Sequence, residues 1–331
     1  MFASIQKKKI MKPFRAGDFL IIGLLLMTVS ACKKSSPPTH TKSVYVAGSD
    51  GSKAVYWKDG AEVPLTNGAT TAWASSIAVA GNDIYAAGED NYNAVYWKNS
   101  DEISLTDGTS GTEAPSIVLS GRDVYVAGRH DDRAVYWKNG TEIPLTDGTT
   151  GALAMCIIIS GSDIYIAGTH ANGAVYWKNG AEVALTDGAT TSVGTSIAVS
   201  GSDIYVAGSH ANKAVYWKNG VEVPLTDGAN FAEALSVTVS GSDIFVAGDE
   251  SNSERPFLVA KYWKNGTEVP LTNGGTTAWA SSITLSGNDV FVAVNEYTPT
   301  NINIAKYWKN GAAIPLTKGN NNASANNIVV Q

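Results

Sequence analysis

The sequence is poor in the residues that build redox, metal and disulfide sites. Only two cysteines, Cys32 and Cys156, and four histidines occur among its 331 residues. It contains no CxxC pair, no HExxH motif, no phosphate-binding glycine loop and no Ser/His/Asp set. We therefore predict no bound metal and no cofactor.

Positive charge is also scarce. The chain has 24 basic and 30 acidic residues, a formal net charge of −6 at pH 7. Residues 1–31 hold five of the basic residues and one acidic residue, so removing that segment would leave 19 and 29, a net charge of −10. Such an acidic body argues against nucleic acid as a partner and against electrostatic attachment to anionic lipid.

The apolar run near the start, Phe19–Val29, is too short to cross a bilayer, because it has about 11 residues where ~20 are needed. It follows a basic segment and ends in Val29-Ser30-Ala31-Cys32. This arrangement resembles the lipobox of bacterial lipoproteins. The basic residues are Lys7, Lys8, Lys9, Lys12 and Arg15.

The lipobox resemblance implies that residues 1–31 are a signal peptide and that Cys32 is acylated. Residues 32–42 are then a lipidated cysteine and a tether, since Ser35–Lys42 is polar and contains proline. Lys33 follows the cysteine, where the inner-membrane retention signal of this family is Asp. We therefore expect an outer membrane lipoprotein that faces the periplasm or the cell surface; the alternative is an ordinary secretory signal.

Two phrases repeat in step through the rest of the chain. Seven copies of Tyr-Trp-Lys are spaced by 40, 40, 40, 40, 46 and 45 residues, each preceded by a phrase of the type I-Y-V-A-G. A period near 40 built of short strands is typical of a propeller or a repeat array. The copies begin at Tyr56, Tyr96, Tyr136, Tyr176, Tyr216, Tyr262 and Tyr307.

One repeat, residues 195–228, predicts four antiparallel strands. The expected strands are 196–200, 204–208, 214–218 and 221–226, with a loop at 209–213 and the hairpin turn Asn219-Gly220. Four such strands in about 40 residues make one propeller blade. Adjacent residues on a strand point to opposite faces, so Tyr216 and Trp217 should pack on the two neighbouring blades.

The two ends of the repeat region are complementary half-units. It opens at Ser43–Gly48 with a second strand that has no first strand, and it closes at Asn327–Val330 with a first strand that has no successor. We therefore predict an all-β, seven-bladed propeller spanning 43–331, closed by pairing of its N- and C-terminal segments. An open β-solenoid, the alternative, would not need complementary ends.

The region from Ser43 to Gln331 resembles uncharacterised bacterial lipoproteins whose propeller repeats carry a Y-W-K-N-G turn. It is similar, more loosely and by symmetry and aromatic content alone, to the bladed lectins, which implies sugar binding. The ligand-binding candidates are Trp73 and Trp279, which share the phrase T-T-A-W-A-S-S, and Phe257 and Tyr297 in two longer loops. All four are expected in loops near blades six, seven and one, as ligand contacts or as lids on the core.

Other repeated polar positions are expected to be structural. The ring of titratable residues that follows each second strand is too wide to share one ion, and the Asp of each G-x-D turn should bond its own turn. Cys156 stands where other units have serine and is expected to be a small buried residue. The ring residues are Asp50, Asp90, His130, His170, His210, Glu250 and Glu296.

Almost every ionisable residue belongs to a repeat, whereas catalysis needs a unique set of groups in one pocket. The favoured function is therefore a membrane-anchored, extracytoplasmic binding or assembly module for a glycan or a protein. The alternatives are a structural surface lipoprotein or a glycan hydrolase or lyase using Glu113, Glu233 or the two longer loops. Glu113 and Glu233 are also candidates for ligand binding.

Overall fold

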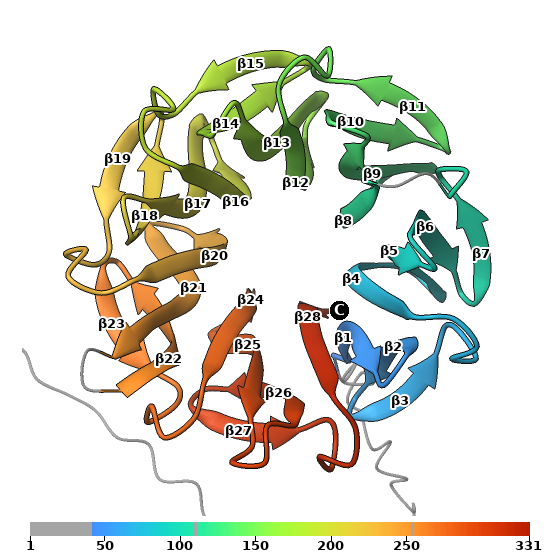
Figure 1. Ribbon diagram of the computed structural model, residues 1–331, viewed down its shortest axis with the longest axis vertical. Helices are drawn as coiled ribbons and strands as arrows, with labels where there is room; N and C mark the ends of the chain where they lie inside the picture. Colours follow the sequence, from blue (N-terminus) through green and yellow to red (C-terminus); the bar gives the residue numbers. More distant parts are fainter. Residues whose placement is uncertain (1–41, 109–110, 253–254) are drawn as a thin grey trace, which may run out of the picture. The chain divides into compact units, whose positions relative to one another are not determined.

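The computed structural model describes residues 42–108, 111–252 and 255–331. Cys32, the signal peptide and the tether up to residue 41 lie outside them. Residues Lys42–Gln331 form a compact unit of 28 strands in seven four-stranded sheets. The sheets are antiparallel blades arranged in a ring, so the unit is the seven-bladed β-propeller that the sequence predicts (Figure 1). The described residues contain no helix that is long and apolar enough to cross a membrane.

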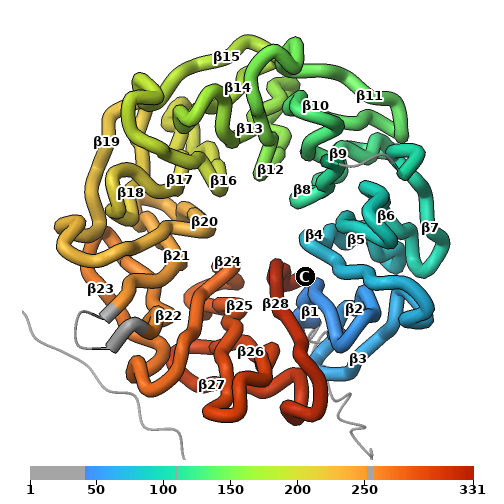
Figure 2. Tube along the Cα trace, in the orientation of Figure 1, coloured from blue at the N-terminus to red at the C-terminus, as the bar shows by residue number. Residues whose placement is uncertain are grey.

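Each blade runs from an inner strand at the centre to an outer strand at the rim (Figure 2). Blade 1 is β28-β1-β2-β3, and blades 2 to 7 follow as β4–β7 through β24–β27. The first, inner strands are β4 (Ala72–Ala80), β8 (Glu113–Ser120), β12 (Ala152–Ser160), β16 (Ser192–Ser200), β20 (Ala232–Ser240), β24 (Ala278–Ser286) and β28 (Ala323–Val330). The second are β1 (Val44–Asp50), β5 (Asp83–Asp90), β9 (Asp123–His130), β13 (Asp163–His170), β17 (Asp203–His210), β21 (Asp243–Asn252) and β25 (Asp289–Tyr297).

The third strands carry the Tyr-Trp-Lys phrase, and the fourth strands are short. The third are β2 (Lys53–Lys58), β6 (Asn93–Lys98), β10 (Arg133–Lys138), β14 (Gly173–Lys178), β18 (Lys213–Lys218), β22 (Arg255–Lys264) and β26 (Asn303–Lys309). The fourth are β3 (Ala61–Pro64), β7 (Asp101–Ser104), β11 (Thr141–Pro144), β15 (Ala181–Ala184), β19 (Val221–Pro224), β23 (Thr267–Pro270) and β27 (Ala312–Pro315).

Blade 1 is closed by the two ends of the repeat region. Strand β28 pairs antiparallel with β1, from Val44 opposite Val330 to Asp50 opposite Ala323. Beyond the strands, the Ser43 N–H donates to the Gln331 carbonyl at 2.7 Å, and the Gln331 N–H donates back at 3.0 Å. The predicted closure is therefore confirmed.

The propeller has two different faces. The turn face carries the turns between first and second strands and between third and fourth strands. The loop face carries the turns between second and third strands and the links to the next blade. In blades 1 to 5 the second and third strands are joined by only two residues, so the loop predicted at 209–213 is a tight turn. Its two residues, Ala211 and Asn212, have φ of 52° and 66°, a left-handed pair that suits a two-residue hairpin.

The Tyr and Trp of each phrase pack into different interblade cores. In blade 5, Trp217 is buried against Tyr165 and Ala167 of blade 4, while Tyr216 packs on the core shared with blade 6. Two large aromatic faces per blade therefore hold the ring together through the hydrophobic effect.

The Asp of each G-x-D turn does not bond its own turn as predicted. In blade 5, Asp203 accepts a hydrogen bond from Nδ2 of Asn219 at 2.9 Å and pairs with Lys218 at 2.8 Å. The Lys218 ammonium also lies 5.2 Å from the centre of the Tyr205 ring. The Asp thus ties the two turns of its blade together, and the side-chain hydrogen bonds from lysine and asparagine lower the Asp203 pKa.

Candidate ligand-binding site

The first strands begin earlier than predicted, which moves two candidate residues out of loops. Trp73 lies in β4, opposite Glu89, and Trp279 lies in β24, opposite Asn295. Both indoles are half-buried. The expectation that these two tryptophans sit in loops is therefore wrong, because the strands continue through polar residues toward the loop face.

Trp279 and Tyr297 form an aromatic pair in blade 7. Their ring centroids are 5.9 Å apart and the planes are tilted by 48°. The pairing follows from the strand register: Trp279 lies opposite Asn295, and Tyr297 is two residues farther along β25, on the same face of the sheet. The half-buried Trp279 therefore packs against Tyr297 on this face of the sheet.

Tyr297 and Phe257 line one pocket of about 580 Å³ on the loop face, between blades 6 and 7. Phe257 lies in β22 and Tyr297 is the last residue of β25, so the expectation that these two residues sit in loops is also wrong. The phenyl group of Phe257 is 37% exposed, a large fraction for a residue of this type. The other lining residues are Gly275, Thr276, Thr277, Thr298, Pro299 and Asn301.

The described residues of the pocket lining are uncharged and rich in hydroxyl groups. Thr298 is fixed within its own turn, since its hydroxyl accepts the Ile302 N–H at 3.0 Å and bonds Thr300 at 2.9 Å. Thr276 donates to Glu296 at 3.2 Å, and that carboxylate pairs with Lys306. The pocket therefore offers two aromatic rings and several hydroxyl and amide groups on a braced frame, and none of its described lining residues is charged.

A second cavity, of about 260 Å³, lies among the inner strands and is bordered by Trp279. The first strands contain β-bulges, and two neighbouring side chains at each bulge line this cavity. In β16 these side chains are Thr195 and Ser196. Trp279 thus lies between the central cavity and the Tyr297 side of the loop-face pocket. Trp73 lines neither of the two cavities, so the structure does not bring it together with the other three aromatic candidates.

A belt of hydrogen bonds surrounds the central cavity. The backbone N–H of one blade donates to the side chain that follows the bulge in the preceding blade. The bonds are Ile117 to Ser76 (3.2 Å), Ile157 to Ser116 (3.1 Å), Val237 to Ser196 (3.2 Å), Ile283 to Ser236 (3.2 Å), Ile328 to Ser282 (3.3 Å) and Ile77 to Asn327 (3.1 Å).

Cys156 takes the remaining place in this belt. Burial raises the pKa of its thiol, and hydrogen bonding with the Ile197 N–H and with Ser196 and Ser116 opposes that rise. The thiol is therefore kept protonated and bonded like the serines it replaces, which is a structural role.

The two carboxylates proposed for catalysis lie in different blades. Glu113 of blade 3 forms an ion pair with Arg129 at 2.6 Å. Glu233 of blade 6 lies opposite Asp249, which is only 1% exposed and has an Oδ1 without a hydrogen-bond partner. Burial, and then the nearby Glu233, raises the pKa of Asp249 to about 8. Neither Glu233 nor Asp249 lines the two cavities, so the pair lacks a substrate pocket there.

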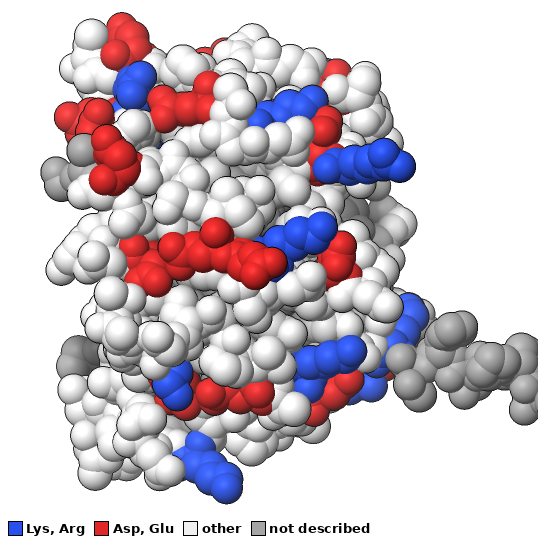
Figure 3. All heavy atoms as spheres, turned by 90° about the vertical axis from the view of Figure 1, so that its right-hand side faces the viewer, with Lys and Arg blue, Asp and Glu red and all other residues white. Residues whose placement is uncertain are grey.

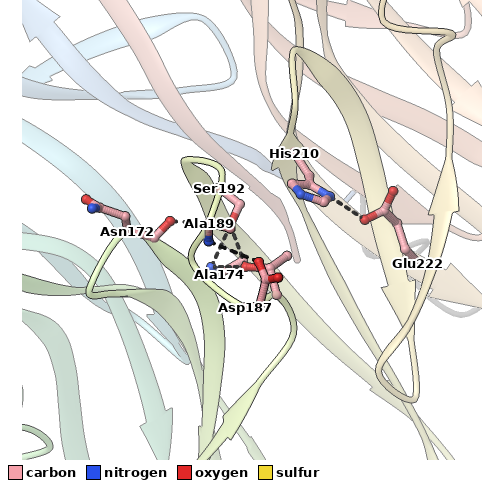
Figure 4. Close-up of polar contacts among 8 residues, drawn as sticks. Asn172, Ala174, Asp187, Ala189, Ser192, His210 and Glu222 are labelled. Atoms are coloured by element: carbon pink, nitrogen blue, oxygen red, sulfur yellow. Dashed lines mark hydrogen bonds and ion pairs between the residues drawn. The ribbon is translucent and has the colours of Figure 1, made fainter.

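The titratable ring is not a loop feature but lies at or near the end of each second strand. Its three histidines pair with glutamates of the fourth strands, whereas Glu250 and Glu296 pair with Lys261 and Lys306 of the third strands. His130, His170 and His210 bond Glu142, Glu182 and Glu222 at 2.6, 2.8 and 2.6 Å. Figure 4 shows His210 directed at Glu222, beside the link turn in which Asp187 accepts the Ala189 N–H. Within the described ranges no three His, Cys, Asp or Glu side chains are grouped so that they could hold a metal ion.

No family model and no curated protein matches the sequence. Solved structures share its fold. They include a puromycin-hydrolyzing peptidase from Mycobacterium tuberculosis (TM-score 0.56, 10% identity, covering 81% of this chain and 50% of that one) and the β-propeller domain of the Trilobed protease from Pyrococcus furiosus (0.51, 12%, 85% and 93%).

A prolyl endopeptidase structure is similar in the same way (0.50, 13%, 88% and 50%). The chain therefore spans about half the length of the first and third of these proteins, and at such identities the likeness concerns the fold alone.

Proposed function

We propose that this protein is a membrane-anchored, extracytoplasmic binding module whose loop-face pocket holds a glycan. The observation that carries the proposal is the convergence of Phe257 and Tyr297 on one 580 Å³ pocket. That volume is within the usual range of small-molecule sites. The Trp279 ring braces Tyr297, so the pocket wall is fixed in place before a ligand arrives.

The chemistry of the pocket favours a neutral sugar. The apolar face of a pyranose ring packs on an aromatic side chain, and its hydroxyl groups exchange hydrogen bonds with threonine, asparagine and backbone groups. Phe257 and Tyr297 supply the first kind of contact, and Thr277 and Asn301 supply the second. An acidic or basic ligand would find no charged partner among the described lining residues.

A glycan array probed with the soluble unit, residues 42–331, tests the proposal. We expect binding to a defined set of neutral glycans, lost in a Phe257→Ala, Tyr297→Ala double variant. Tyr92→Ala is the matched control, because Tyr92 is a loop-face aromatic that is 76% exposed and does not line the pocket. An array without hits, together with a pull-down that captures a protein through the same pocket, would replace the glycan by a protein ligand.

Membrane attachment is proposed from the lipobox alone. Val29-Ser30-Ala31-Cys32 after a basic start and a short apolar run supports acylation of Cys32 and export. The acidic composition supports anchoring through lipid rather than through charge, because anionic lipid would repel the body of the protein.

A further inference from the structure

The chain enters the propeller on its turn face. Ser43 and Gln331 pair through two backbone hydrogen bonds where β1 begins and β28 ends. Nζ of Lys42 donates to Oγ of Ser286, which lies at the turn between β24 and β25. The attachment point of whatever precedes Lys42 is therefore on the face opposite the Phe257–Tyr297 pocket.

Charge is distributed unequally between the two faces. Residues 42–251 and 257–331 contain 16 basic and 28 acidic residues. The turn face, taken as the turns and the strand residues next to them, holds nine of the basic and eight of the acidic residues. They are Lys42, Lys58, Lys98, Arg122, Lys138, Lys178, Lys218, Lys264 and Lys309, with Asp59, Asp83, Asp101, Asp123, Asp163, Asp203, Asp243 and Asp289.

The loop face and the rim therefore carry seven basic and 20 acidic residues, a formal charge of −13 against +1 on the turn face. Figure 3 shows one side of the molecule: acidic side chains extend across it, and most of the lysine and arginine side chains in view lie toward one edge. Six of the turn-face lysines are paired with aspartates, for example Lys138 with Asp123 at 2.8 Å. The turn face is thus nearly neutral, and an anionic surface repels only the rest of the unit.

We propose that the turn face lies toward the lipid surface and the loop face, with its pocket, points away from it. This rests on the proposed acylation of Cys32. Lys42 is the tenth residue after Cys32, and a fully extended chain of that length reaches at most about 35 Å. The tether holds the turn face close to the headgroups, and the charge on the loop face and rim disfavours the inverted orientation near anionic lipid.

Two labelled variants of the full chain test the orientation. The background is Cys156→Ser, which restores the serine that other blades carry at this place. Ser202→Cys and Thr190→Cys then place one fluorophore at either end of β16, on exposed residues of the turn face and the loop face. A nine-residue strand keeps the two positions roughly 30 Å apart. Acylated protein is reconstituted into vesicles whose headgroups carry a quencher.

We expect quenching at position 202 to exceed quenching at position 190 at least about twofold, because contact quenching does not reach across a strand of this length. The ratio should rise when phosphatidylcholine is partly replaced by phosphatidylglycerol, since the acidic loop face is then repelled. Equal quenching, or stronger quenching at 190, overturns the orientation while leaving the anchor intact. If the protein does not float with the vesicles, both the lipid anchor and the orientation are wrong. A failure to bind glycans would not bear on either of these two proposals.

Discussion

Trp279 packs against Tyr297 in blade 7, with the two ring centroids 5.9 Å apart and the ring planes tilted by 48°. The contact joins an inner-strand residue, which borders the central cavity, to a residue that lines the loop-face pocket. A change at Trp279 should therefore be felt at a pocket that its own side chain does not line.

We predict that Trp279→Ala weakens ligand binding by 10-fold or more. Loss of an aromatic contact costs on the order of 1–3 kcal/mol, and about 1.4 kcal/mol corresponds to one decade in Kd. Trp73→Ala is the matched control, because Trp73 has the same local sequence and stands at the same place in blade 2. Kd values from titration calorimetry, with the melting temperature of each variant, check this. Equal losses of affinity in both variants would show that the two tryptophans affect binding only through the stability of the fold.

The two tryptophans also show where sequence reasoning stops. The shared phrase T-T-A-W-A-S-S suggests equal roles for Trp73 and Trp279. Their partner strands differ, because the residue two places beyond the opposing one is Tyr297 in blade 7 and Asn91 in blade 2. A local motif fixes the position on the strand, but the neighbouring strand decides what the side chain contacts.

Some parts of the fold could be predicted from the sequence and others could not, and each outcome has a physical reason. The Tyr-Trp-Lys strand and its Asn-Gly turn recur with a fixed period, so blades and closure could be predicted. The start of each first strand was missed, since a bulge at residues such as Thr195 breaks the alternation of apolar and polar residues. The turn at Ala211 was also missed, because alanine with φ of 52° is not a turn signal in a sequence.

The burial of Asp249 was equally hidden, because the matching positions in other blades hold polar residues of every kind. In this structure Asp249 is 1% exposed and faces Glu233. Burial, the larger cause, and the nearby Glu233 raise the pKa of Asp249 to about 8. In the unfolded chain its pKa is near 3.9. The folded state therefore binds a proton that the unfolded state has lost between about pH 4 and pH 8, and stability falls as pH rises through this window.

From this we expect Asp249→Asn to stabilise the protein at pH 7, raising Tm by about 2–4 °C or more, since about 1 kcal/mol corresponds to such a shift in a chain of this size. The amide has the shape of the carboxyl group but no charge to desolvate. The gain should shrink steadily toward pH 4, because the carboxyl of the unfolded chain also takes up its proton as the pH approaches 3.9. Asp101→Asn, at an exposed position, is the control. Thermal melts from pH 4 to pH 8 test this, and a gain that is the same at all pH values would contradict it.

Cys32→Ala should leave the protein without lipid. Acylation at this residue is the only membrane attachment that the proposed function includes, so the variant should leave the membrane fraction and lose labelling by a palmitate analogue. Cys156→Ser, which keeps Cys32, should behave like the unmodified chain in both assays. Persistent labelling of the Cys32→Ala variant would remove the anchor from the proposed function.

Among the side chains of the terminal segment, Ile328 should contribute most to the closure of blade 1. Ile328 is 1% exposed and packs with Val46 and Trp57, whereas Val329 and Val330 are only partly buried. We therefore expect Ile328→Ala to lower the free energy of unfolding by about 2–5 kcal/mol, the usual cost of such a truncation in a core. Val330→Ala should cost clearly less, because part of its side chain already faces solvent. Removal of residues 327–331 should exceed both, since it also opens the edge of β1. Denaturant titration ranks the three variants, and an Ile328→Ala protein as stable as the parent would mean that the terminal strand does not hold the ring closed.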